Sequence, residues 1–134
     1  VARRNAARHA VAGQIRFVRG DLLAPVRGPL DVVVANLPYV ATTELPGLPP
    51  QVGRYEPRLA LDGGEEGLSL IRALIAQAVG RLAPGGWLFV EVGAGQAERV
   101  ADLVRATGAF AEVTCRRDLG GVLRLVSGRL WTRS

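Results

Sequence analysis

The tetrapeptide Asn36-Leu37-Pro38-Tyr39 carries the residue types best suited to chemistry in this sequence. A carboxamide oxygen and a main-chain carbonyl can accept hydrogen bonds from the N–H groups of a planar substrate, and a tyrosine ring can stack on it. We assign the acceptor roles to Asn36 and the Leu37 carbonyl, and the stacking role to Tyr39. Such a site would hold a nitrogen nucleophile in line for a displacement reaction, which depends mainly on positioning.

The residues before the tetrapeptide predict where it lies in the fold. Residues 30–35 form an almost continuous apolar run, as expected for a strand of a parallel sheet that is covered on both faces. Ligands of open α/β sheets bind at the carboxyl ends of the strands, where this tetrapeptide would lie. The alternative is that Asn36 is only a turn residue at a strand end. The preceding strand and the following Pro-Tyr pair favour the binding role.

Apolar periodicity predicts an α/β fold with a mainly parallel sheet and an antiparallel C-terminal hairpin. The expected helices cover residues 2–12, 68–82 and 96–107, and the expected strands cover residues 14–18, 30–35, 87–92, 111–116 and 122–126. Residues 83–86 are expected to stop the second helix, and Gly120-Gly121 to turn the hairpin. Residues 40–64 are rich in proline and glycine without periodicity, which is typical of a lid or binding loop.

The composition restricts the class of protein. The 134 residues suffice for one domain, and no stretch approaches the roughly 20 apolar residues of a membrane span. No secretory signal is visible in the given sequence, which contains one cysteine and one histidine, Cys115 and His9. We therefore expect a cytoplasmic protein with no membrane partner, no internal disulfide and no His/Cys metal site.

The net charge of +5 comes from 17 basic residues, all of them arginine, against 12 acidic ones. One interpretation is attraction to an RNA-rich partner such as a ribosome-bound factor. The other is a bias toward arginine over lysine in a GC-rich genome. No aromatic residues that could stack on bases alternate with the arginines, which favours the second interpretation. Direct, specific nucleic-acid binding is therefore not expected.

Three stretches of the chain resemble the release-factor glutamine methyltransferases, a branch of the class I S-adenosylmethionine-dependent methyltransferases. They are residues 2–23, from Ala2-Arg3-Arg4-Asn5-Ala6 to Gly20-Asp21-Leu22-Leu23, the tetrapeptide, and residues 55–68, which begin Tyr55-Glu56-Pro57-Arg58. The tetrapeptide resembles those of enzymes that methylate adenine, guanine or glutamine, whereas the third stretch is more particular to the glutamine branch. The resemblance implies a Rossmann-like sheet and methyl transfer from S-adenosyl-L-methionine to a glutamine side-chain amide of a peptide chain release factor.

The resemblance also implies roles for individual residues. Catalysis and substrate binding fall to Asn36, Leu37, Pro38 and Tyr39, with Glu56 shaping the substrate site, and cofactor binding falls to Asp21, Leu22 and Asn36. Asp21 as a plain turn residue and Glu56 as a solvated loop carboxylate are the alternatives. Leu37 stands where the family has proline, so a fixed φ is lost and lower activity or a shifted substrate is expected.

The chain lacks the glycine-rich turn and the acid-ended strand that hold the cofactor in this class. We therefore expect residues 1–134 to be the C-terminal part of a single catalytic domain without its first two strands. The native protein would then be a complete methyltransferase, or this chain would be a non-catalytic remnant or binding module. A third alternative is an amino-methyltransferase acting on a nucleobase or a ribosomal protein. The exposed sheet edge predicts dimerisation.

Overall fold

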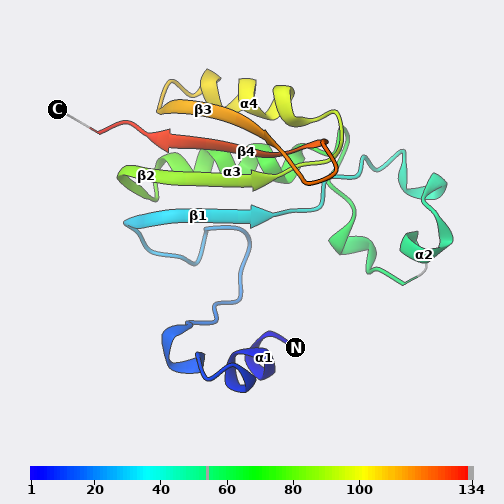
Figure 1. Cartoon of the computed structure of the whole chain (residues 1–134), viewed down its shortest axis with the longest axis horizontal. Coiled ribbons are helices and arrows are strands. Elements are labelled where there is room, and N and C mark those ends of the chain that lie inside the picture. Colours follow the sequence, from blue (N-terminus) through cyan, green and yellow to red (C-terminus); the bar gives the residue numbers. More distant parts are fainter. Residues whose placement is uncertain (54, 133–134) are drawn as a thin grey trace.

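The computed structural model describes residues 1–53 and 55–132 and is built on one four-stranded sheet (Figure 1). The strands are β1 (Leu30–Asn36), β2 (Leu82–Glu91), β3 (Phe110–Arg117) and β4 (Leu123–Leu130), in the order β1-β2-β4-β3. β1 runs parallel to β2, and Asn36 lies beside Glu91 in their register. The carboxyl ends of both strands therefore meet at one edge of the sheet.

Two amphipathic helices cover one face of this sheet. In α3 (Ser69–Val79), Ile71, Leu74, Ile75 and Ala78 are buried, and α4 (Ala97–Ala106) buries a similar row of small and branched residues. These residues recur every three or four positions, so they form one stripe along each helix. They pack on inward-facing sheet residues such as Leu88 and Val126. Each large apolar side chain buried there contributes roughly 1.5–3 kcal/mol to stability.

The opposite face of the sheet has no helix packed on it among the described residues, contrary to the expectation of cover on both faces. Val32 and Val34 of β1 are 51% and 76% exposed. Their neighbours in register, Trp87 and Phe89, stack with ring centroids 5.7 Å apart. An apolar strand thus carries an open apolar face, because the two helices that pack on the sheet lie on the same side.

The sheet confirms the α/β, Rossmann-like class and the antiparallel C-terminal hairpin, with β4 between β2 and β3. The expectation of a mainly parallel sheet was wrong for the described strands. Only the β1–β2 pairing is parallel, and the β2–β4 and β3–β4 pairings are antiparallel. The C-terminal hairpin supplies two of the four described strands, and both antiparallel pairings involve its strand β4.

The largest differences from the predicted elements lie at the start of the chain and between α3 and β2. Residues 2–12 contain a shorter helix, α1 (Ala2–Arg8), followed by a 3₁₀ turn (Ala12–Gln14), and residues 14–18 are not a strand. Ile15 and Val18 are 42% and 50% exposed, because this segment pairs with no described strand. At the other end, α3 stops at Val79 and β2 already begins at Leu82, so residues 83–86 belong to the strand.

Residues 40–64 form a loop whose two ends are hydrogen-bonded to each other, and the loop projects beyond the carboxyl ends of β1 and β2 (Figure 1). It contains α2 (Pro50–Gly53) and two 3₁₀ turns (Leu45–Gly47 and Arg58–Ala60). Its ends are joined because the Val40 N–H donates to Leu61 O (3.0 Å) and the Gly63 N–H donates to Val40 O (2.8 Å). The predicted lid or binding loop is therefore anchored at its base. No described helix is long and apolar enough to cross a bilayer.

The carboxylate of Asp62 fastens this base and makes it sensitive to acid. It accepts hydrogen bonds from Thr42 Oγ1 (2.7 Å) and the Gly64 N–H (3.1 Å). These bonds, followed by the nearby Arg58 guanidinium, lower the pKa of Asp62 below its usual 3.8. A carboxyl whose pKa is lower in the folded state stabilises that state above its unfolded pKa, and loses this effect as pH falls through the folded value.

We expect the loop base to loosen in acid, below about pH 4, and the substitution Asp62→Asn to remove this pH dependence. Hydrogen exchange of the Gly64 amide between pH 6 and pH 3, corrected for intrinsic rates, measures the effect. Asp102→Asn is the matched control, because Asp102 forms an exposed pair with Arg105 on α4, away from the loop. Equal pH dependence in the wild type and Asp62→Asn would contradict the assignment.

The edge and the open face of β1 predict self-association. The chain exposes 9112 Å², about one third more than the roughly 6,800 Å² expected for a folded monomer of 14.2 kDa. An antiparallel pair of β1 strands with a two-fold axis at Val33 would place Val32 opposite Val34 of a second copy.

Light scattering at about 100 μM should give the mass of a dimer or a larger species, and Val34→Lys should shift it toward monomer, since lysine on an edge strand opposes pairing. Leu119→Lys, on the exposed turn between β3 and β4, is the control for added charge. A monodisperse monomer of the wild-type chain would refute this prediction.

Candidate functional site

The tetrapeptide leaves β1 at the edge where the carboxyl ends of β1 and β2 meet. Asn36 is the last residue of β1 and is exposed, while Leu37, Pro38 and Tyr39 are half-buried. Within the described residues the Asn36 side chain makes no hydrogen bond, so its amide oxygen is available to a ligand. Asn36 is therefore not buried in the interior, and its binding role stays a prediction.

A cavity of about 620 Å³, the Asn36 cavity, gathers five of the predicted site residues. It is lined by Asn36, Leu37, Pro38, Tyr39, Val40, Leu48, Val52, Glu56, Ala60 and Leu61. Glu56 joins the tetrapeptide because the loop of residues 40–64 folds back over the strand end. The structure thus brings all of the predicted substrate-binding residues together around one cavity. Their chemical roles remain predictions.

Asp21 and Leu22 lie elsewhere and do not line the Asn36 cavity. They belong to a turn whose Leu23 N–H donates to Gln77 Oε1 (2.8 Å) near the C-terminal end of α3. That helix end is followed directly by the start of β2, so the turn lies toward the amino ends of the strands. Leu22 packs against the core. The structure therefore does not bring Asp21 and Leu22 to Asn36, and their cofactor role remains a prediction.

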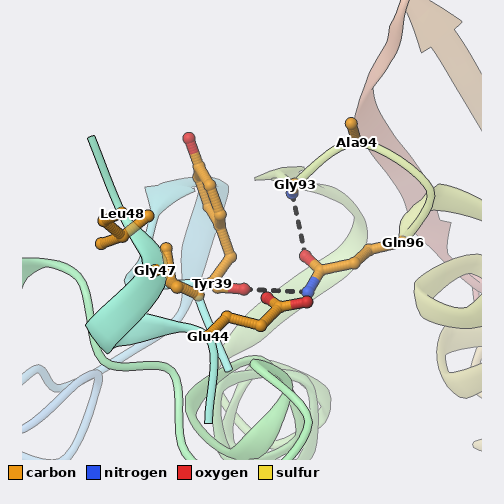
Figure 2. Close-up of a pocket in the computed structure, with 8 residues that line it drawn as sticks. Tyr39, Glu44, Gly47, Leu48, Gly93, Ala94 and Gln96 are labelled. Carbon is orange, nitrogen blue, oxygen red and sulfur yellow. Dashed lines mark hydrogen bonds between the residues drawn. The ribbon is translucent and has the colours of Figure 1, made fainter. Parts of the chain in front are cut away.

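A second cavity of about 510 Å³, the Gln96 cavity, shares Tyr39, Val40 and Leu48 with the Asn36 cavity, and Figure 2 shows its lining. Its lining comprises Tyr39, Val40, Glu44, Gly47, Leu48, Gly93, Ala94 and Gln96. Sequence analysis missed Gln96. The available signal was its position five residues after β2 ends, which places it at the same sheet edge as the tetrapeptide.

Two glycines allow the chain to approach the tetrapeptide closely. A Cβ atom on Gly63 would lie 2.6 Å from Pro38 O, well inside contact distance. Gly67 has φ +69°, and a Cβ atom there would collide with Tyr39 O and lie 2.8 Å from Gln96 Nε2. Both positions therefore require glycine for space, and Gly67 also for its backbone conformation.

Comparison with known proteins supports the resemblance to the release-factor glutamine methyltransferases that the motifs indicate. No protein-family profile matches the sequence. The chain is 48% identical over 122 residues to the release factor glutamine methyltransferase of Moorella thermoacetica, which covers 90% of this chain and 43% of the relative. The enzyme of the same name from Bradyrhizobium diazoefficiens is 44% identical over 128 residues, with 96% and 43% covered. This chain corresponds to the C-terminal part of the release factor glutamine methyltransferases.

The chain spans less than half the length of these methyltransferases. A solved structure of an O-methyltransferase family protein from Burkholderia thailandensis superposes on 99% of this chain and 41% of its own length, with a TM-score of 0.61 and 19% identity. At this identity the likeness shows the fold alone. The fold is thus part of a class I methyltransferase fold.

Leu37 is the residue of the tetrapeptide at which the sequence resemblance implies a departure from the family. It is half-buried, packs against the core and lines the Asn36 cavity. The side chain leaves the cavity open, with about 620 Å³ of space. Leu37 therefore does not block the site in which the family resemblance places the acceptor.

Proposed function

We propose that this chain supplies the acceptor-binding side of a methyltransferase that modifies the side-chain amide of a glutamine in a peptide chain release factor. One observation carries the proposal: the tetrapeptide and Glu56 line a single cavity beside the carboxyl end of β1. The names of the similar proteins support the choice of substrate. We place the reaction in the cytoplasm, with no membrane partner.

The acceptor nitrogen needs orientation more than it needs a base. An amide nitrogen is a weak nucleophile, because its lone pair is delocalised into the carbonyl. Asn36 Oδ1 and Leu37 O would each accept one of its N–H hydrogens, and Tyr39 would hold the amide plane. Both acceptors favour positive charge that develops on the nitrogen. The methylated nitrogen is acidic enough to lose its proton to solvent.

The methyl donor is proposed as S-adenosyl-L-methionine, the donor used by class I methyltransferases. The described residues do not assemble a complete site for it. Asp21 and Leu22 lie toward the amino ends of the strands, away from Asn36. The glycines nearest to Asn36 serve the packing of the tetrapeptide instead. We therefore derive the acceptor side of the reaction only, and expect the chain alone to be incomplete for activity.

The distribution of charge favours RNA as a second candidate substrate. Residues 1–29 contain six arginines and one aspartate, whereas residues 30–134 contain eleven arginines and eleven acidic residues. The whole net charge is thus concentrated in the first segment. All six arginines there are exposed, and none forms an ion pair among the described residues. A general compositional bias would not produce this asymmetry, and such a surface attracts phosphate groups.

A methylation assay distinguishes the candidates. The chain is incubated with radiolabelled S-adenosyl-L-methionine and, separately, with a bacterial release factor, ribosomal proteins or RNA, and modified glutamine is located by mass spectrometry. Calorimetry with S-adenosyl-L-methionine and with the release factor is run in parallel. Binding of the release factor without transfer is the expected result for the isolated chain. Transfer to a release-factor glutamine would show that the chain is catalytically complete, and transfer to RNA alone would refute the proposed substrate.

A further inference from the structure

The side chain of Gln96 joins the two strand ends at which the proposed site is built. Its Nε2 donates to Tyr39 O (2.9 Å), and its Oε1 accepts from the Gly93 N–H (2.9 Å), as Figure 2 shows. We call these two hydrogen bonds the Gln96 bridge. Tyr39 follows β1 and Gly93 follows β2, so the bridge couples the tetrapeptide to the neighbouring strand.

The atoms around the Gln96 bridge leave it little freedom. A Cβ atom on Gly93 would lie 2.8 Å from Gln96 Oε1 and 3.1 Å from Tyr39 Cδ2, so the ring of Tyr39 packs closely beside the bridge. Gly67 closes another side, since a Cβ atom there would lie 2.8 Å from Gln96 Nε2. A side chain that is held by two hydrogen bonds and close neighbours keeps one orientation.

Each atom of the Gln96 carboxamide therefore has a separate task. The oxygen satisfies the Gly93 N–H at the start of the turn into α4. The nitrogen fixes the peptide plane that follows Tyr39, and so restrains a residue that lines both cavities. Glutamate can perform only the first task while it is ionised, because a carboxylate has no proton to donate to Tyr39 O.

We propose that Gln96 is a positioning residue that holds Tyr39 and its main chain in the orientation needed to bind the acceptor amide. This inference rests on the proposed function for its consequence in substrate binding. Its geometric part, the restraint of Tyr39 by the Gln96 amide nitrogen, stands independently of that function. Gln96 acts through Tyr39 and does not contact the acceptor amide itself.

The variant Gln96→Glu tests the inference through its pH dependence. At pH 8 the ionised carboxylate cannot donate to Tyr39 O, so the NMR signals of the Tyr39 ring should shift and a glutamine-containing release-factor peptide should bind about tenfold more weakly. At pH 5 a larger fraction of the carboxyl is protonated than at pH 8, so the donor to Tyr39 O should be restored in part; Tyr39 O favours the protonated form there, whereas the Gly93 N–H favours the ionised form. Peptide affinity and the ring signals should then move back toward those of the wild type.

Other titratable groups near the Gln96 bridge are controlled by comparison with the wild type. The charged residues on the surrounding elements include Glu44, Asp62, Glu65, Glu66, Arg72, Glu91, Glu98, Arg99 and Arg124. Of these, Glu44 lines the same cavity, and Glu66 is held by Arg99 (2.9 Å) and Arg72 (3.2 Å), which lower its pKa. The wild type and Gln96→Glu share all of these groups, so a pH response found only in the variant comes from residue 96.

Gln77→Glu is the matched control. Gln77 Oε1 only accepts, from the Leu23 N–H, so glutamate can keep this bond at both pH values. This variant should bind the peptide as the wild type does, and Gln96→Ala should lose affinity equally at pH 5 and pH 8. Wild-type behaviour of Gln96→Glu at pH 8, or a loss of the same size at pH 5 and pH 8, would overturn the inference. If the wild type binds no peptide, the proposed function fails, and the reversible shift of the Tyr39 ring still decides the role of Gln96.

Discussion

Replacement of Asn36 by alanine should remove most of the affinity of this chain for its proposed substrate. We expect Asn36→Ala to weaken the binding of a glutamine-containing release-factor peptide by about tenfold, because one acceptor is lost and an amide N–H is left unpaired in the Asn36 cavity. In a methylation assay with a competent enzyme the loss should reach about 100-fold, as for the removal of one hydrogen-bonding group that stabilises a transition state. Calorimetry with wild-type and variant chains measures the first effect directly.

Two further substitutions make this result specific. Asn36→Asp keeps oxygen acceptors at the same place and should retain more affinity than Asn36→Ala. Asn5→Ala removes the same amide from exposed α1, far from the cavity, and should leave affinity unchanged. Equal affinities of Asn36→Ala and the wild type for the peptide would show that the amide is only a strand-end residue.

The second large effect is expected at Gly67, which makes room for the main chain of the tetrapeptide. Gly67→Ala should destabilise the fold by at least about 2 kcal/mol, since the left-handed conformation costs an alanine roughly 1–2 kcal/mol and the new methyl group also collides with Tyr39 O. Urea unfolding measures this loss. The same collision should displace Tyr39 and weaken peptide binding.

The chain offers two controls that separate backbone strain from collision. Gly95 also has positive φ (+81°), but a Cβ atom there meets nothing within 4 Å, so Gly95→Ala should show the strain alone and keep peptide affinity. Gly47 has free space and no positive φ, so Gly47→Ala should be close to neutral. If Gly67→Ala costs no more than Gly95→Ala, close packing against Tyr39 is not what requires glycine at position 67.

The sequence predicted the elements whose pattern is local. β1, α3, α4 and the C-terminal hairpin follow from apolar runs, helical spacing and glycine turns, and the tetrapeptide follows directly from the end of β1. The segment 14–18 alternates as a strand does, yet it forms none, because a strand needs a partner and periodicity does not supply one. In the same way, the apolar residues on both sides of β1 predict cover on both faces, but periodicity does not supply the element that would cover the second face.

The site was predictable where it lies in one stretch of sequence, and less so where distant segments meet. Glu56 reaches the tetrapeptide because the loop base is tied by Val40 and Gly63, which no local pattern reveals. Gln96 is an ordinary polar residue before a helix, and its importance appears only with the positions of Tyr39 and Gly93. Asp21 lies apart from Asn36 because the turn that contains it is anchored on Gln77.

The most direct test uses a release-factor peptide in which the side-chain nitrogen of the acceptor glutamine carries ¹⁵N. The chain is added, and the two protons on that nitrogen are followed by NMR. If Asn36 Oδ1 and Leu37 O accept them, both proton signals should move downfield and exchange slowly with water, and Asn36→Ala should reverse the change for one of them. A bound peptide whose amide protons keep the shifts and exchange rates of free peptide would contradict the account.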